Sequence, residues 1–342
     1  MNVHQVLSGA GPHDAVTTQA LAFRALFRAW GWGGRDVAAE IDPRVGNCVA
    51  PLRALAPLQR DVLLIHYSAY APKLRGVLQM PQRKLLISHN ITPARWFWDH
   101  DPQAGVVCAL GRKQLPEFAA AVDVAAGVSR YNARELGSDV VIPILFDPAQ
   151  LGAAREREPP QPPVVLFVGR LAPHKRQDAV VRAFELFRRR HASDARLVLV
   201  GAPINMRYEQ AMRALADELS PGHVTIESSL TREQLAERYR SARAFLCLSE
   251  HEGFCIPLLE AFHFGVPVIA RAVGGVPEVA GDAALLLAPD DDESVVAELL
   301  ALAVSDRQLR DVLRERAAAR VAAYAPEPTA RKLRDALQSL GA

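Results

Sequence analysis

Short apolar runs recur along the chain, and a helix-like stretch follows most of them. Several runs, such as 62–65 and 164–168, hold four or five consecutive apolar residues. Strands that are covered on both faces read in this way, and they belong to parallel sheets with helical crossovers. The pattern therefore predicts an α/β fold. The expected strands are 3–8, 61–66, 84–89, 122–128, 139–143, 164–168, 195–200, 223–226, 244–248, 266–270 and 283–288.

A proline-rich stretch divides this pattern into two sets. Residues 151–163 hold four prolines and a run of alternating charges without periodicity, which is typical of a stiff linker. A chain of 342 residues suits two domains. We expect two Rossmann-like, doubly wound parallel-sheet domains over 1–150 and 164–325. The amphipathic tail 326–342 is expected to form a helix, either on the surface or packed back on the first domain.

Composition excludes several classes of protein. The net charge of +2 does not indicate a nucleic-acid partner, and no apolar stretch is long enough for a membrane span. The N-terminus lacks the basic flank and apolar run of a signal peptide, so we expect a cytoplasmic protein. Basic residues such as Arg24 and Arg28 leave open a weak peripheral membrane contact. The four cysteines lack zinc-site spacing, and we expect reduced thiols and no metal.

Residues 249–265 place two acids on either side of a predicted helix start. Glu252 comes before this start and Glu260 after it, and Pro257 suits the first helical turn. The free N–H groups and the dipole at a helix start favour an anion such as a diphosphate. The acids then need another partner, and sugar hydroxyls would supply it. Two solvated glutamates are the alternative.

A second loop, 169–175, follows the first strand of the second domain. Gly169 lets the backbone approach a ligand, and Arg170 and Lys175 supply two positive charges. Arginine can hold a phosphate with two parallel hydrogen bonds, whereas lysine acts as a point charge. Both loops leave the same edge of the predicted sheet, so they favour a common diphosphate site over two isolated solvated cations.

The first domain carries weaker candidates. Gly9 and Gly11 lie in a loop between the first strand and its helix, as in nucleotide-binding α/β domains. His89 ends a predicted strand, and His66 occupies a similar place; each is alternatively a core histidine. His13 and Asp14 either contact an acceptor or cap the helix. Trp96 and Trp98 either stack on a sugar or pack in a loop.

Five motifs in order resemble the family 4 retaining glycosyltransferases of the GT-B fold, whose two domains face a cleft. The resemblance covers nearly all of 164–325. The motifs are Gly169-Arg-Leu with Lys175, Leu248-Ser-Glu-His-Glu-Gly-Phe254, the pair Glu252 and Glu260, Gly265-Val-Pro-Val268, and Gly274-Gly-Val-Pro-Glu278.

The resemblance implies transfer of a sugar from a nucleoside diphosphate sugar to a sugar, lipid-linked or small-molecule acceptor, with retention and without a metal or cofactor. Polysaccharide, glycolipid or natural-product assembly is the implied setting. The implied catalytic residues are His89, Arg170, Lys175 and Glu252. The implied donor-binding residues are Gly9, Gly11, Gly169, Arg170, Lys175, Glu252, Gly253, Phe254, Cys255 and Glu260. The acceptor candidates are His13, Asp14, Trp96 and Trp98.

The chain departs from the family pattern at three places. Cys255 stands where a small residue is common, Arg176 stands where glycine is usual, and the first loop reads Gly9-Ala-Gly-Pro12 instead of Gly-Gly.

Other functions stay open. An epimerase or phosphorylase of the same fold is one alternative, and a two-lobed sugar-binding protein without catalysis is another. A dehydrogenase is disfavoured because no Gly-x-Gly-x-x-Gly follows either first strand. The base, sugar and acceptor are not predicted.

Overall fold

The computed structural model describes residues 1–12, 14–154 and 161–341 and divides into two compact units. Unit 1 comprises Met1–Arg95, Pro102–Leu145 and the tail from Pro326. Unit 2 comprises Trp96–Asp101 and Phe146–Ala325. The acceptor candidate His13 and residues 155–160 of the predicted linker lie outside the described residues.

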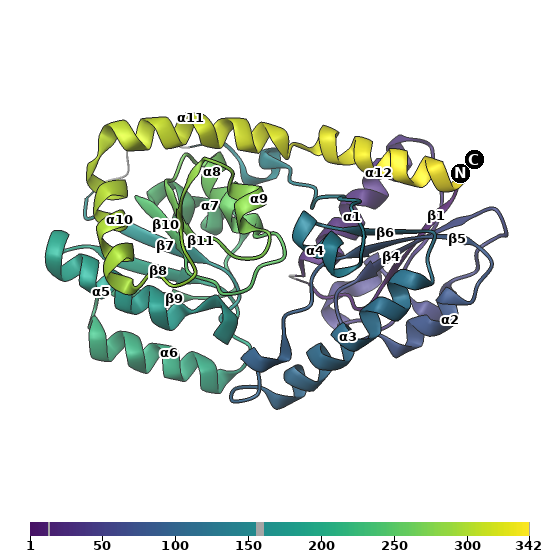
Figure 1. Cartoon of the computed structure of the whole chain (residues 1–342), viewed down its shortest axis with the longest axis horizontal. Helices are drawn as coiled ribbons and strands as arrows, with labels where there is room; N and C mark the ends of the chain where they lie inside the picture. The colour runs from purple at the N-terminus through teal and green to yellow at the C-terminus, as the bar shows by residue number, and fades with distance from the viewer. Residues whose placement is uncertain (13, 155–160, 342) are drawn as a thin grey trace. The chain divides into compact units, whose positions relative to one another are not determined.

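Each unit is built on a six-stranded parallel sheet with helices on both faces (Figure 1). The sheet of unit 1 has the order β3-β2-β1-β4-β5-β6. Its strands are β1 (Val3–Leu7), β2 (Asp36–Ala38), β3 (Ala50–Pro51), β4 (Val62–Tyr67), β5 (Arg83–Ser88) and β6 (Val124–Gly127). Its helices are α1 (Ala15–Ala29), α2 (Arg75–Leu78), α3 (Pro102–Ala120), α4 (Arg130–Glu135) and α12 (Pro326–Gly341).

The sheet of unit 2 has the order β12-β11-β10-β7-β8-β9. Its strands are β7 (Val164–Val168), β8 (Arg196–Val200), β9 (Val224–Glu227), β10 (Ala244–Cys247), β11 (Val268–Arg271) and β12 (Ala284–Leu287). Its helices are α5 (Gln177–His191), α6 (Met206–Leu219), α7 (Arg232–Ser241), α8 (Ile256–His263), α9 (Val276–Ala280), α10 (Glu293–Ser305) and α11 (Arg307–Ala323). The 3-10 turns of the chain are η1 (Pro43–Cys48), η2 (Leu52–Ala54), η3 (Pro72–Leu74), η4 (Ala94–Trp96), η5 (Pro148–Leu151) and η6 (Pro173–Lys175).

Both sheets share one topology. Counted within each unit, the strand order is third, second, first, fourth, fifth, sixth, which is the doubly wound Rossmann order. The order reverses between β1 and β4 in unit 1 and between β7 and β10 in unit 2. Ligands of such sheets bind beyond the carboxyl ends of the strands at this reversal. The predicted fold class is confirmed.

Some predicted elements were wrong or missing. Residues 139–143 do not form a strand; Val141 makes only an isolated bridge to Gly127. The edge strands β2 and β3 were not predicted. They are three and two residues long and include Asp36 and Pro51, so they lack the apolar run of a central strand.

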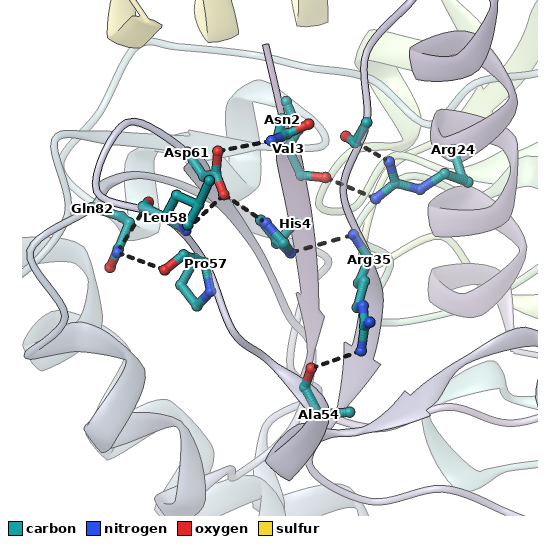
Figure 2. Close-up of polar contacts among 11 residues, drawn as sticks. Asn2, Val3, His4, Arg24, Arg35, Ala54, Pro57, Leu58, Asp61 and Gln82 are labelled. Carbon is teal, nitrogen blue, oxygen red and sulfur yellow. Dashed lines mark hydrogen bonds and ion pairs between the residues drawn. The ribbon is translucent and has the colours of Figure 1, made fainter.

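A polar cluster joins the amino ends of β1 and β4, at the sheet edge opposite the reversal loops (Figure 2). Asp61 accepts hydrogen bonds from Asn2 Nδ2 (3.0 Å) and the Leu58 N–H (2.8 Å) and contacts His4 Nε2 at 3.1 Å. His4 Nδ1 accepts from the Arg35 N–H, so its Nε2 carries the proton donated to Asp61. Burial alone would raise the pKa of Asp61, but these donors outweigh it and lower the pKa.

Apolar side chains fill the core of each unit. In unit 2, Phe184 and Phe187 of α5 pack with β7, β8 and α10 and are fully buried. In unit 1, α12 packs against β4 and β5, and Leu333 and Leu337 are fully buried. Among the described residues, every helix is too short or too polar to cross a bilayer.

Candidate functional site

The two loops predicted to bind an anion lie side by side in unit 2. The first follows β7 and contains Arg170 and the 3-10 turn η6; the second follows β10 and leads into α8. Because β7 and β10 are hydrogen-bonded neighbours, their carboxyl ends place both loops at the reversal of strand order. The sequence prediction that these loops share one sheet edge is confirmed by this pairing.

Lys175 and Glu252 form the centre of this site. Lys175 Nζ lies 2.6 Å from Glu252 Oε1, and the side chains are 18% and 8% exposed. Burial opposes the positive charge of Lys175, but the Glu252 carboxylate outweighs it, so the pKa of Lys175 is raised. Lys175 is therefore positively charged at neutral pH. Its contact with the Glu252 carboxylate balances the two opposite charges, and both side chains are largely shielded from water.

Arg170 supplies a second cation that is available to a ligand. The Arg170 side chain is exposed and makes no hydrogen bond or ion pair with the described residues. Its backbone is held in place because Gln177 Nε2 donates to the Arg170 carbonyl at 3.0 Å. His174, also in this loop, is buried, and burial together with the Lys175 charge lowers its pKa to about 2. The positive charge of the loop thus comes from Arg170 and Lys175.

The start of α8 adds one free backbone donor. No side chain of the described residues caps α8, Pro257 in its first turn has no N–H, and the Leu258 N–H donates to the Cys255 carbonyl at 3.2 Å. The Ile256 N–H is therefore the donor that the helix start offers to an anion. Phe254 packs edge-on against Tyr324 with ring centroids 5.3 Å apart, so its side chain belongs to the core and its backbone borders the site. Gly253 belongs to the same loop, and its backbone is buried.

Glu260 is held by a tyrosine of the preceding helix. Tyr239 of α7 donates its hydroxyl to Glu260 Oε2 at 2.6 Å. Burial raises the pKa of Glu260, and this hydrogen bond opposes the rise. None of the described residues donates a hydrogen bond to Glu260 Oε1. Oε2 is therefore held by Tyr239, and Oε1 can accept a hydrogen bond from a ligand hydroxyl.

The two departures from the family pattern in unit 2 fall on left-handed backbone positions. Arg176 has φ 53° and Cys255 has φ 76°. Glycine or a small residue is favoured there because a side chain crowds the neighbouring carbonyl. The ion pairs of Arg176 with Asp178 (3.0 Å) and with Glu250 offset part of this backbone strain. Position 274 requires glycine for another reason. Its backbone passes so close to Glu252 that a Cβ there would lie 2.0 Å from the Glu252 carbonyl oxygen.

In unit 1, the glycine loop leaves space at the end of β1. Neither Gly9 nor Gly11 has a positive φ, so the backbone does not require glycine there. A Cβ on Gly9 would meet only the Glu40 carbonyl oxygen, at 3.9 Å, which leaves room for a ligand. Asp14 caps α1, since its carboxylate accepts from the N–H groups of Val16 and Thr17. Of the two roles predicted for Asp14, the structure shows the capping role.

His89 ends a chain of hydrogen bonds that fixes its tautomer. Gln5 Nε2 donates to the Ala20 carbonyl and to Asp36 Oδ1, both at 2.8 Å, so Gln5 Oε1 must be the acceptor that faces His66 Nε2 at 2.9 Å. His66 therefore carries its proton on Nε2. Burial, together with the repulsion that a protonated His89 would exert, lowers the pKa of His66 well below its usual value, so the ring is neutral at neutral pH.

The same reasoning extends to the second ring. His66 Nδ1, being unprotonated, accepts from His89 Nε2 at 2.9 Å. Burial lowers the pKa of His89 to about 3, so His89 is neutral and its Nδ1 is a bare acceptor. This atom is shielded from water and has no hydrogen-bond partner among the described residues. His89 thus presents an acceptor to a ligand, and the donor it requires is a hydroxyl or N–H group.

The two tryptophan candidates, Trp96 and Trp98, lie within a short segment that groups with unit 2. Trp96–Asp101 groups with unit 2 although its neighbours in sequence belong to unit 1. Phe97 meets His174 edge-on at 5.8 Å between ring centroids, and Asn205 Nδ2 donates to the His100 carbonyl at 2.9 Å. The side chain of Trp98 is 46% exposed. Phe97, which lies between Trp96 and Trp98 in the sequence, therefore contacts the loop that carries Lys175.

The sequence prediction missed several supporting residues. Gln5, Tyr239 and Cys247 read as parts of an ordinary strand or helix, and the sequence leaves His66 open between a core histidine and a site residue. The useful signal was a polar residue within an otherwise apolar strand, as at Gln5 and His66, because such a group needs a buried partner. Tyr239 and Cys247 gave no comparable signal.

Comparison with known proteins identifies the family. Residues 153–320 match the family "Glycosyl transferases group 1". D-inositol 3-phosphate glycosyltransferase of Mycobacteroides abscessus is 35% identical over 189 residues, covering 51% of this chain and 41% of that protein. O-antigen chain mannosyltransferase B of Escherichia coli is 30% identical over 135 residues, covering 40% and 35%. The chain thus spans less than half the length of these relatives.

Solved structures share the whole architecture. Sucrose-phosphate synthase from Thermosynechococcus elongatus superposes with a TM-score of 0.76 at 17% identity, covering 99% of this chain and 98% of that one. Anabaena HepE, solved in complex with UDP-glucose, gives a TM-score of 0.74 at 14% identity, covering 99% and 100%. The fold is accordingly the GT-B fold of two Rossmann-like domains. The match places residues 153–320, which make up most of unit 2, in the group 1 glycosyltransferase family.

Proposed function

We propose that the protein is a retaining glycosyltransferase that moves a sugar from a nucleoside diphosphate sugar to an acceptor hydroxyl. The observation that carries the proposal is the Lys175–Glu252 pair at the strand-order reversal of unit 2, beside the available Arg170 and the uncapped start of α8. Two cations and the free Ile256 N–H suit a diphosphate, and the neighbouring acids suit hydroxyls.

The cations have a clear chemical task in this reaction. Breaking a glycosyl phosphate bond concentrates negative charge on the leaving diphosphate. Arg170 and Lys175 would stabilise that charge, and the Ile256 N–H at the start of α8 would add a fixed dipole. We infer that these groups take the place of a metal ion.

Glu252 changes partners in this mechanism. Without a ligand it accepts from Lys175 at 2.6 Å. When Lys175 turns its hydrogen bonds to the diphosphate, Glu252 is left with a shielded charge that needs new donors. Hydroxyls of the transferred sugar supply them, so phosphate binding and sugar recognition are coupled. Glu260 holds the ribose hydroxyls through Oε1, with Oε2 fixed by Tyr239.

In unit 1, we propose that His89 Nδ1 accepts a hydrogen bond from a substrate hydroxyl, because it is a neutral acceptor that none of the described residues pairs. Gly9 and Gly11 allow close approach of substrate to the backbone. Trp96 and Trp98 are the proposed stacking surfaces for an acceptor. No covalent nucleophile is invoked; the leaving diphosphate oxygen takes the proton of the acceptor on the face from which it departs.

A nucleotide panel tests the proposal directly. UDP, GDP, ADP and dTDP, each with and without a linked sugar, are added to the protein and the melting temperature is recorded. A ligand at about 100 times its dissociation constant adds roughly 2.7 kcal/mol of stability. One nucleotide should raise the melting temperature, and its sugar conjugate should raise it further. The absence of a shift with every nucleotide would overturn the proposal.

Product analysis then separates transfer from the other reactions of this fold. A transferase leaves a glycosylated acceptor, whereas an epimerase changes only the donor sugar and a phosphorylase requires phosphate. The names of the relatives suggest two acceptor classes for the first trials: a polyol phosphate and a growing surface glycan. A sugar-binding protein without catalysis would bind the sugar and return it unchanged.

A further inference from the structure

Two buried thiols lie against the Lys175–Glu252 pair. Cys247 ends β10 and Cys255 precedes α8, and their Sγ atoms are 4.0 Å apart. Cys247 Sγ is also 4.0 Å from Glu252 Oε1. One ligand atom from each of the three residues lies within 4.8 Å of the other two, and all three side chains are buried.

These distances approach those of a tetrahedral metal site. With zinc–sulfur bonds of about 2.3 Å and zinc–oxygen bonds of about 2.0 Å, neighbouring ligand atoms are separated by roughly 3.4–3.8 Å. The sulfur–sulfur distance of 4.0 Å has to shorten by only a few tenths of an ångström. Two thiolates and one carboxylate are ligands that zinc and cadmium accept, whereas magnesium and calcium prefer oxygen alone.

We propose that Cys247, Glu252 and Cys255 form a binding site for one thiophilic divalent cation such as Zn²⁺ or Cd²⁺. The metal would bind by exchange: each thiol releases its proton to solvent, and the cation takes the place of the two protons. The formal charge of the buried cluster is the same before and after this exchange, because the two thiolates balance the two charges of the cation and Glu252 and Lys175 keep their opposite charges. Charge burial therefore does not oppose the metal.

Three protein ligands leave one tetrahedral position for water or an anion. Occupation of the site draws Glu252 away from the Lys175 ammonium, since the carboxylate oxygen then binds the cation. One consequence rests on the proposed function. A metal in the site weakens donor binding, because the metal binds Glu252 and leaves Lys175 without its carboxylate partner, and the donor needs both side chains. Metal binding itself requires only the three ligands.

Cadmium is the probe, because a cadmium–thiolate bond adds an ultraviolet charge-transfer absorption. The reference protein is Cys48→Ser/Cys108→Ser, in which the two thiols of the site are the remaining cysteines. It is reduced with a phosphine, which does not compete for the metal as a dithiol would. Titration should develop the thiolate absorption to an end point of one Cd²⁺ per chain, and Zn²⁺ should displace it.

Variants assign the ligands. Cys247→Ser in the reference background should remove most of the absorption and weaken binding by about 100-fold or more, since even outer partners of a metal contribute 10–100-fold. Glu252→Gln should weaken binding about tenfold or more and keep the thiolate absorption. Cys255→Ser provides a second test of the sulfur ligands. Circular dichroism without metal verifies that each variant is folded.

The proposal is wrong if the folded reference protein gives no thiolate absorption, or if Cys247→Ser and Cys255→Ser both retain it. Nucleotide binding is then measured with and without Cd²⁺. Loss of the nucleotide-induced thermal shift on adding Cd²⁺ supports the coupling. Absence of a nucleotide shift in metal-free protein contradicts the proposed function and leaves the cadmium result standing by itself.

Discussion

At the scale of single residues, the site depends on which polar groups are paired and which are left open. Lys175 and Glu252 satisfy each other, Arg170 is exposed, and His89 Nδ1 is a buried acceptor that has no hydrogen-bond partner in the described part of the chain. A buried unpaired acceptor costs free energy, and this cost supports our proposal that a substrate supplies the missing hydrogen bond.

Replacing Lys175 by glutamine tests its charge apart from its structural contact. The amide can still donate to Glu252, so the variant should fold, whereas alanine would leave the carboxylate unpaired. Losing the cation should weaken nucleoside diphosphate binding about tenfold or more and lower turnover about 10²–10³-fold. Lys113→Gln, at an exposed lysine of α3, is the control. Wild-type affinity in Lys175→Gln would remove Lys175 from the phosphate site.

The His66–His89 pair predicts a particular dependence of stability on pH. Both histidines have pKa values below their unfolded value of 6.5, and that of His89 is about 3. Below pH 6.5 the unfolded chain takes up protons that the folded protein does not. Stability is therefore complete above pH 6.5 and is lost as the pH falls toward 3, by up to about 1.4 kcal/mol per pH unit for each histidine.

Urea unfolding at several pH values between 7 and 4 measures this slope. The double variant His66→Gln/His89→Gln should be less stable at pH 7 and should show a shallower decline than wild type. His100→Gln, which replaces an exposed histidine, should leave the slope unchanged. Equal slopes in wild type and the double variant would mean that the pair is protonated in the folded protein.

At the scale of elements, two reversal loops and two helix starts build the site of unit 2. The helix α5 begins after Arg176 and α8 begins after Cys255, and both of these residues adopt left-handed backbone. This conformation turns each chain from a strand end into a helix. The cost is about 1–2 kcal/mol for a residue with a side chain.

Two substitutions of Arg176 separate backbone strain from ion pairing. Arg176→Ala and Arg176→Gly both lose the contacts with Asp178 and Glu250, but glycine tolerates φ 53°. The glycine variant should therefore be more stable by about 1 kcal/mol, measured by chemical unfolding. Arg182→Ala and Arg182→Gly, within α5, should show the reverse order, because glycine is the poorer helix former. Equal stability of the two Arg176 variants would contradict the strain argument.

At the scale of the whole molecule, one topology occurs twice and the chain ends in the unit where it began. The donor candidates Arg170, Lys175 and Glu252 belong to unit 2, whereas Gly9 and His89 belong to unit 1. After completing unit 2, the chain returns through α12, which packs on β4 and β5. The last helix is therefore part of the core of unit 1.

Truncating the buried leucines of α12 should destabilise unit 1. Leu333 and Leu337 are fully buried, and each leucine-to-alanine change should cost about 2–5 kcal/mol. The exposed Gln338→Ala on the same helix should change stability by less than about 0.5 kcal/mol. Hydrogen exchange of β4 and β5 localises the effect. Unchanged protection of these strands in Leu333→Ala would show that α12 does not stabilise unit 1.

The sequence by itself determined the two α/β units and the two loops of the candidate site. Central strands need apolar residues on both faces, and loop motifs keep their spacing from the strand that precedes them, so both signals are local. The edge strands β2 and β3 were not predicted, because short, half-covered strands carry little of that signal. A strand was wrongly predicted at 139–143, because Val141 has the β-branched character of a strand residue but makes only an isolated bridge.

Only the tertiary structure decided which distant side chains meet. A buried polar group takes whichever partner packing brings to it, and sequence spacing does not encode that partner. The packing of α12 on unit 1 is likewise set by complementary surfaces. The contacts that follow from packing alone are His66 with His89, Tyr239 with Glu260, and Cys247 with Cys255.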